Sequence, residues 1–160
     1  DAHAKVIKEL FDSGKGIYIW GDNSPYHADA DFLAKKLVGV TMSGTFMGDK
    51  NVTFKDYNTK SGMKKDHLIT TGLEFVYEGV TISKLHDLNQ QLTPLIYSTD
   101  GNVVTGIYER DGKRLIIDGG FTRLYNKWDT AGTGRYVKNA AAWLVNYERF
   151  GNDVLGENIK

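Results

Sequence analysis

Helical stripes and short apolar runs alternate along the first part of the chain. Residues 1–12 carry an apolar stripe at helical spacing, which predicts an amphipathic helix. The stripe consists of Val6, Ile7, Leu10 and Phe11. The uninterrupted run Ile17–Trp20, ended by Gly21, predicts a buried strand that is covered on both faces and paired along both edges. Helical spacing returns over residues 28–37, and this helix–strand–loop–helix order predicts a layered α/β domain.

The middle of the chain has a weaker pattern. Residues 38–66 are polar and punctuated by glycines, so we expect a loop or edge excursion with one strand over Asn51–Tyr57. The segment His67–Leu73 predicts a turn that leads into a strand or a short helix. Partial alternation predicts a further strand over Phe75–Ile82.

Three strands are predicted in the second half of the chain, over Leu95–Ser98, Val103–Tyr108 and Arg114–Asp118. The dipeptides Asp100-Gly101 and Asp111-Gly112 separate them, and Asp-Gly between apolar runs is a strong hairpin signal. These strands therefore predict an antiparallel meander.

A long helix with a broad apolar face is predicted over residues 130–150. We expect residues 1–150 to form a single domain and residues 151–160 to form a polar tail. The chain does not open on methionine, so we expect a processed or excised piece of a longer protein. Either downstream segments of this chain complete the sheet beside Ile17–Trp20, or an upstream segment or another chain does so.

Composition excludes several classes of function. The 160 residues hold 20 basic and 20 acidic side chains, so no net charge favours nucleic acid or an anionic membrane surface. There is no cysteine, which removes thiolate nucleophiles, disulfides and cysteine-held metals. No apolar run is long enough to span a membrane, so we expect a soluble protein whose compartment stays open. No motif predicts a cofactor.

Three segments together resemble the class I glutamine amidotransferase-like superfamily, in particular its trehalose-utilisation-type relatives. They are Gly14–Gly21, His67–Leu73, and Gly112–Gly120 followed by Asn139–Asn146. The resemblance implies a flavodoxin-like three-layer sandwich with a mainly parallel sheet. Active members carry a nucleophilic cysteine after the strand equivalent to Ile17–Trp20, whereas this chain has none. The resemblance therefore implies a domain without amidotransferase chemistry.

The loop after Trp20 is the first candidate site, because ligands of open α/β sheets bind beyond the carboxyl ends of the strands. It carries four polar side chains, Asp22, Asn23, Ser24 and His27. A second candidate group follows the last strand and consists of Arg123, Tyr125 and Trp128, with His67 as a further candidate ligand contact. Arginine captures carboxylates or phosphates, and the aromatic rings stack on planar ligands or sugars.

Each of these groups also has a structural interpretation. Asn23 or Ser24 would brace the turn, and Arg123 would pair with Asp118 or Asp129. A hydrolase would need Ser24 as nucleophile with His27 or His67 as base, or Asp22 as base, although no Gly-x-Ser-x-Gly elbow is present. His27 and Asp31 share a helix face, but this spacing does not predict a metal site.

The leading functional hypothesis is a non-catalytic or diverged amidotransferase-like domain that binds a small molecule or a protein partner. Two alternatives stay open. One is a small hydrolase that acts on a sugar or acyl substrate. The other is a structural domain whose sheet is completed by an upstream segment, a partner chain or a second copy of this chain.

Overall fold

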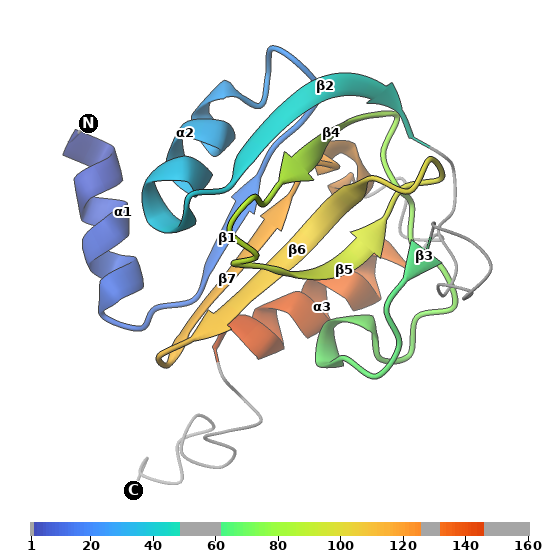
Figure 1. Ribbon diagram of the computed structural model, residues 1–160. Coiled ribbons are helices and arrows are strands. Elements are labelled where there is room, and N and C mark those ends of the chain that lie inside the picture. The colour runs from blue at the N-terminus through green and yellow to red at the C-terminus, as the bar shows by residue number, and fades with distance from the viewer. Residues whose placement is uncertain (1, 49–61, 126–131, 146–160) are drawn as a thin grey trace, which may run out of the picture.

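A mixed five-stranded sheet lies at the centre of the computed structural model, which describes residues 2–48, 62–125 and 132–145 (Figure 1). The helices and 3₁₀ turns are α1 (Ala2–Asp12), α2 (Ala28–Val38), η1 (Leu68–Thr70), η2 (Phe121–Leu124) and α3 (Thr133–Leu144). The strands are β1 (Ile17–Trp20), β2 (Thr41–Met47), β3 (Gly62–Met63), β4 (Thr81–His86), β5 (Thr93–Tyr97), β6 (Val103–Arg110) and β7 (Lys113–Asp118).

The strand order of the central sheet is β1-β7-β6-β5-β3. β1 runs parallel to β7, with Trp20 opposite Asp118, and the other pairs of this sheet are antiparallel. Asp111 and Gly112 turn between β6 and β7 with φ values of 52° and 73°, the two positive angles of a type I′ hairpin turn. The two Asp-Gly dipeptides thus join consecutive antiparallel strands, and the predicted meander is confirmed.

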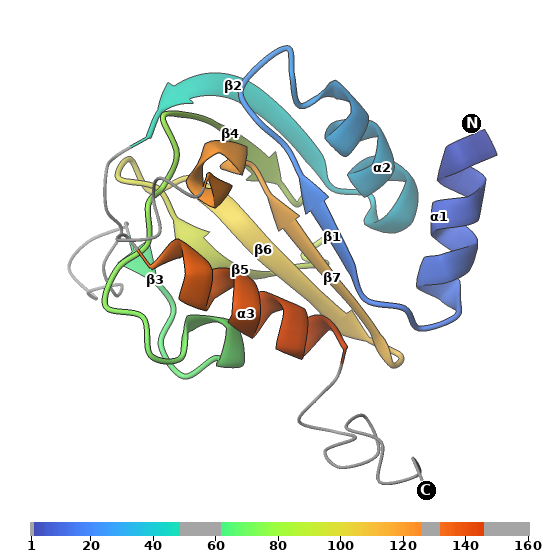
Figure 2. The same ribbon diagram turned by 180° about the vertical axis from the view of Figure 1, so that it is seen from behind.

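Helices cover both faces of this sheet. α3 packs across one face, whereas α2 and the antiparallel β2–β4 ribbon cover the other (Figures 1 and 2). Successive residues of β7 point to opposite faces, so Ile116 packs in the apolar cluster beneath α3 and its neighbours Leu115 and Ile117 pack in the cluster beneath α2. Both clusters belong to the same sheet, and β7 stabilises both.

The expected flavodoxin-like three-layer sandwich is wrong, because the sheet contains one parallel pair and is otherwise antiparallel. A strand that is apolar on both faces, such as Ile17–Trp20, indicates cover on both faces. It does not indicate the direction of its neighbours. The apolar runs therefore predicted buried strands correctly and gave no reason to assume a parallel sheet.

Two predictions about individual strands are corrected. Ile17–Trp20 is predicted to pair along both edges, but among the strands of the described residues β1 is an edge strand with β7 as its only neighbour. The strand predicted over Phe75–Ile82 begins only at Thr81, and β2 was missed because glycine and polar residues interrupt its alternation. The strand predicted over Asn51–Tyr57 and the tail predicted over residues 151–160 lie outside the described residues.

None of the helices in the described part of the chain is long and apolar enough to cross a membrane.

The close approach of β1 and α3 generates a first prediction. A Cβ atom on Gly16, just before β1, would overlap the carbonyl oxygen of Leu144 at the end of α3. Gly16→Ala should therefore lower the free energy of unfolding by about 1–3 kcal/mol, as for other overpacking substitutions, in a urea titration. Lys15→Ala, at the exposed neighbouring position, is the control and should change it by no more than about 0.5 kcal/mol. Equal stability of the two variants would contradict this packing.

Candidate functional site at the carboxyl ends of β1 and β7

The loops that follow β1 and β7 lie side by side because the two strands are parallel neighbours. The backbone N–H of Gly21 donates to the carbonyl oxygen of Asp118 at 2.6 Å, and the N–H of Phe121 donates back to the carbonyl oxygen of Gly21 at 3.0 Å. The loop that carries Asp22 therefore meets η2 at one rim of the sheet.

A buried carboxylate organises this rim. Asp118 is fully buried, and its Oδ2 accepts hydrogen bonds from the hydroxyls of Tyr18 at 2.7 Å and Tyr136 at 3.2 Å. Its Oδ1 accepts from the N–H of Gly120 at 2.8 Å and lies 3.2 Å from Nη2 of Arg123. These side chains come from β1, β7, η2 and α3, so one carboxylate joins four elements of the fold.

Arg123 is also fully buried, and its guanidinium holds the backbone around it. Nη2 donates to the carbonyl oxygen of Glu78 at 3.1 Å and Nε donates to that of Gly120 at 3.3 Å. Burial alone would lower the pKa of Arg123, but the Asp118 carboxylate opposes this and the pKa is raised above its usual value. Arg123 therefore stays charged and binds its own chain rather than a ligand at the surface.

The two tyrosines of the cluster are held in their neutral form. Burial raises the pKa of Tyr18 well above its usual value, and the nearby Asp118 carboxylate raises it further. The same two causes, in the same order, raise the pKa of Tyr136. The two hydroxyl oxygens lie 2.7 Å apart, so both phenols must keep a proton to form their hydrogen bonds.

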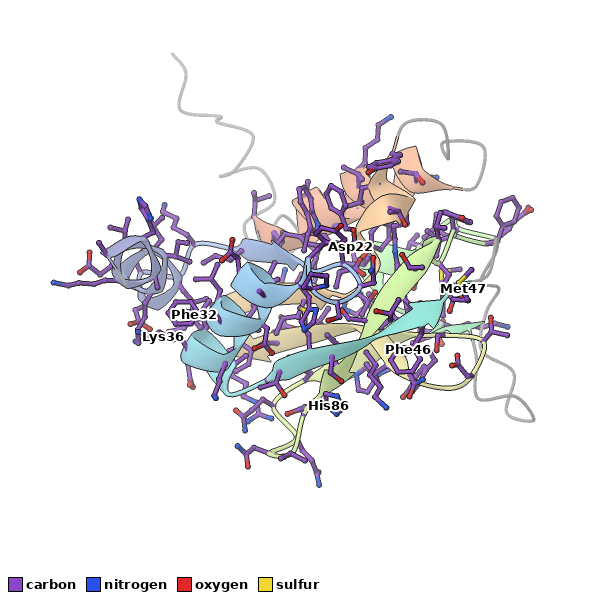
Figure 3. The ribbon with its side chains drawn as sticks, turned by 90° about the horizontal axis from the view of Figure 1, so that it is seen from above. Asp22, Phe32, Lys36, Phe46, Met47 and His86 are labelled. Atoms are coloured by element: carbon purple, nitrogen blue, oxygen red, sulfur yellow. The ribbon has the colours of Figure 1, made fainter. Side chains whose placement is uncertain are left out.

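Hydrogen bonds also tie the loop after β1 to the β2–β4 ribbon. Oδ1 of Asp22 accepts from the N–H of Asn23 at 2.8 Å, and Oδ1 of Asn23 accepts from the Thr81 hydroxyl at 2.8 Å. The N–H of Ser24 donates to the carbonyl oxygen of Gly44 at 2.9 Å. Asp22 lies at the end of β1 on this rim, as Figure 3 shows. Asp22 and Asn23 thus brace the loop.

The residues proposed for hydrolysis do not form a nucleophile and base in this structure. Among the described residues, no hydrogen bond joins the hydroxyl of Ser24 to His27, and Nδ1 of His27 is buried without a partner. His27 begins α2 without capping it through its side chain. A serine nucleophile needs an imidazole within hydrogen-bond reach and a group that orients that imidazole.

His67 lies away from this rim. Its Nδ1 accepts from the N–H of Ile69 at 3.2 Å and so caps η1, and its ring lies 5.6 Å from that of Trp143. Trp143 lies near the beginning of β7, since its carbonyl oxygen accepts from Nη1 of Arg114 at 2.6 Å. Asp22 and His67 are therefore at opposite ends of β7. Trp128 lies outside the described residues.

A group of aromatic side chains lies at the rim and consists of the half-exposed Trp20 and Tyr125 and the partly buried Phe121. We call it the aromatic cluster. Trp20 is 49% exposed and Tyr125 is 46% exposed. The ring of Phe121 lies 6.2 Å from that of Trp20 and 5.7 Å from that of Tyr125. Sequence reasoning identified Tyr125 but missed the other two. The signal for Trp20 was its position as the last residue of a strand that ends at the rim.

Two features define the class of protein. The first is a mixed α/β domain. The second is a rim at which the polar side chains proposed as ligand contacts bond to their own chain, while aromatic side chains are exposed. No group of three or more histidines and acidic residues able to hold a metal ion occurs within residues 2–48, 62–125 and 132–145.

Comparison with known proteins agrees with the fold. A solved structure described as the mmIFT52 N-terminal domain resembles this chain with a TM-score of 0.64 and 14% sequence identity. The likeness covers 90% of this chain and 71% of the other. No family model matches the sequence, and neither does any curated protein.

The resemblance to the class I glutamine amidotransferase-like superfamily is therefore wrong. The structural neighbour and the mixed sheet overturn it. The short glycine-containing motifs that suggested it, such as Gly14–Gly21, occur wherever a turn leads into a buried strand.

The buried carboxylate generates a prediction about stability. Asp118→Asn should lower the free energy of unfolding by about 3–5 kcal/mol, because it leaves the charge of Arg123 buried without its partner. Tyr18→Phe removes one hydroxyl that donates to Asp118 and should cost about 1–3 kcal/mol. Urea denaturation measures both. A smaller loss for Asp118→Asn than for Tyr18→Phe would contradict the central role of the ion pair.

The neutral tyrosines generate a prediction about pH. Unfolded tyrosines ionise at their usual pKa of 10.0, whereas Tyr18 and Tyr136 ionise at higher pH in the folded state. Their contribution to stability should be complete below pH 10.0 and should be lost as the pH rises from there through the folded-state pKa values. Chemical denaturation at increasing pH should show this decline.

An absorbance titration of tyrosinate provides the control. Tyr18→Phe should leave the amplitude of the native protein near its usual pKa unchanged, because Tyr18 does not ionise there. A reduced amplitude in Tyr18→Phe at that pH would show that Tyr18 ionises there and would contradict the buried cluster.

Proposed function

We propose that this chain is a non-catalytic protein-interaction domain and that the aromatic cluster is its contact surface. The observation that carries the proposal is the half-exposure of Trp20 and Tyr125 around Phe121 at one rim of the sheet. Large aromatic side chains are enriched in the buried centres of protein interfaces, where they supply much of the binding energy.

The rigidity of the rim supports this proposal. Phe121 and Tyr125 flank Arg123, whose guanidinium is buried against Asp118, and Trp20 precedes Gly21, whose backbone is bonded to β7 and η2. Tyr18 and Trp20 also pack with ring centroids 5.0 Å apart. A surface held in this way loses little conformational entropy when a partner binds.

The geometry of the rings favours a protein partner over a sugar. The planes of Trp20 and Phe121 are inclined by 55°, and those of Phe121 and Tyr125 by 87°. The cluster therefore offers edges and faces in several directions instead of one flat platform. Asp22 and Asn23, the polar side chains beside it, already form hydrogen bonds within the loop.

A photo-cross-linking experiment tests this function. Benzoylphenylalanine at position 125 should cross-link a discrete partner in an extract of the source cells, because this position lies in the aromatic cluster. The same probe in place of Tyr26, which is more exposed but lies outside the cluster, should not cross-link it.

Excess unlabelled native protein should suppress the cross-link, and excess Trp20→Ser should not. Equal cross-linking at positions 125 and 26, or equal competition by the two proteins, would contradict the proposal.

A further inference from the structure

The edge of β1 that faces away from β7, its free edge, pairs with no strand among the described residues. The N–H and C=O of Gly21 both bond to residues that follow or end β7. The directions of backbone N–H and C=O groups alternate from residue to residue along a strand of a parallel pair. The backbone groups of Ile17 and Ile19 therefore also point to β7, and those of Tyr18 and Trp20 point to the opposite side, outward from the edge of the sheet. Outside the β1–β7 pairing, no backbone hydrogen bond among the described residues involves Tyr18 or Trp20.

α1 runs beside this edge without closing it (Figures 1 and 2). Only Ala4 and Phe11 of α1 are buried, whereas Val6 and Leu10 are 55% and 48% exposed. Proteins usually protect a sheet edge with charged residues, proline, a bulge or a covering element. The segment Ile17–Trp20 has no charge, proline or bulge, and α1 leaves much of its own apolar stripe uncovered.

We propose that an extended, uncharged segment of a partner protein adds a strand to the free edge of β1. This inference rests on the proposed function, since it names the kind of partner that the domain binds. The added backbone would bond to the N–H and C=O groups of Tyr18 and Trp20. Its alternating apolar side chains would pack against the aromatic cluster on one face of the sheet and beside α1 on the other.

A second copy of this chain is a poorer occupant of the edge. Pairing of β1 with β1 of another copy would place an α1 helix of each copy beside the same pair of strands, because α1 runs along this edge. A single extended segment needs only the width of one strand, about 4.8 Å from β1.

Selection of random linear peptides by phage display on the native protein supplies the probe. A selected peptide, synthesised and added to the isotope-labelled protein, should slow hydrogen exchange of the Tyr18 and Trp20 amides. The amides of Ile17 and Ile19 face β7 and serve as internal controls, because they are already bonded without the peptide. Protection confined to other amides would overturn the proposal. Failure to select any peptide, from a library that yields binders to a control protein, would also overturn it.

A pair of variants separates strand addition from binding to the aromatic cluster alone. Trp20→Ala and Trp20→Pro both remove the indole, but only the proline variant also removes the outward N–H. An edge strand tolerates proline at such a position. Trp20→Pro should bind the selected peptide at least about fivefold more weakly than Trp20→Ala. In both variants, hydrogen exchange at the amides of β7 should be unchanged, which shows that the sheet is intact.

Equal affinity of the two variants, together with weaker binding by Tyr125→Ala, would overturn strand addition and leave the interaction surface intact. Retained peptide binding without any specific cross-link at position 125 would instead count against the proposed function alone.

Discussion

The buried ion pair of Asp118 and Arg123 is the interaction on which the rim of this domain depends. Removing two charges from water costs several kcal/mol each unless their remaining hydrogen-bonding groups are also satisfied. Here Tyr18, Tyr136 and Gly120 supply donors to the carboxylate, and carbonyl oxygens accept from Nε and Nη2 of the guanidinium. Its Nη1 is buried without a hydrogen-bond partner among the described residues. Strand β1, helix α3 and the turn after β7 must therefore keep their relative positions for the pair to remain compensated.

The buried ion pair also determines which aromatic side chains are exposed at the rim. Because the side chain of Arg123 points into the interior, Phe121 at the start of η2 stays partly exposed and Tyr125, just after η2, is half-exposed. Because Tyr18 points to Asp118, Trp20, two residues along the strand, lies on the same face of the sheet and extends the aromatic cluster. Asp22, Asn23 and Arg123, which the sequence suggested as ligand contacts, instead hold the loops that carry these aromatic rings.

The local structure was more predictable than the topology. Ile17–Trp20 and the strands around the two Asp-Gly turns could be predicted because an apolar run and a hairpin turn are properties of neighbouring residues. Strand direction and edge position depend on which distant segments pair, so the parallel sheet and the doubly paired β1 were wrong. β2 was missed because Gly44 and its polar neighbours conceal its alternation, and its strand geometry depends on pairing with β4.

In the candidate site, too, contacts between residues close in the chain could be predicted and contacts between distant residues could not. The pairing of Arg123 with Asp118 was one of the structural interpretations open from the sequence, because the two residues are close in the chain. Tyr18 and Tyr136 could not be connected with them, since 118 positions separate the two hydroxyls that meet over Asp118. The exposure of Trp20 was equally hidden, because a tryptophan that ends an apolar run is usually assigned to the core.

Proton NMR of the tyrosine hydroxyls tests the central claim most directly. The hydroxyl protons of Tyr18 and Tyr136 should exchange slowly enough with water to be resolved and should show a nuclear Overhauser effect to each other, whereas that of Tyr26 should not be resolved. Hydroxyl protons of Tyr18 and Tyr136 that exchange as fast as that of Tyr26 would contradict a buried network around Asp118.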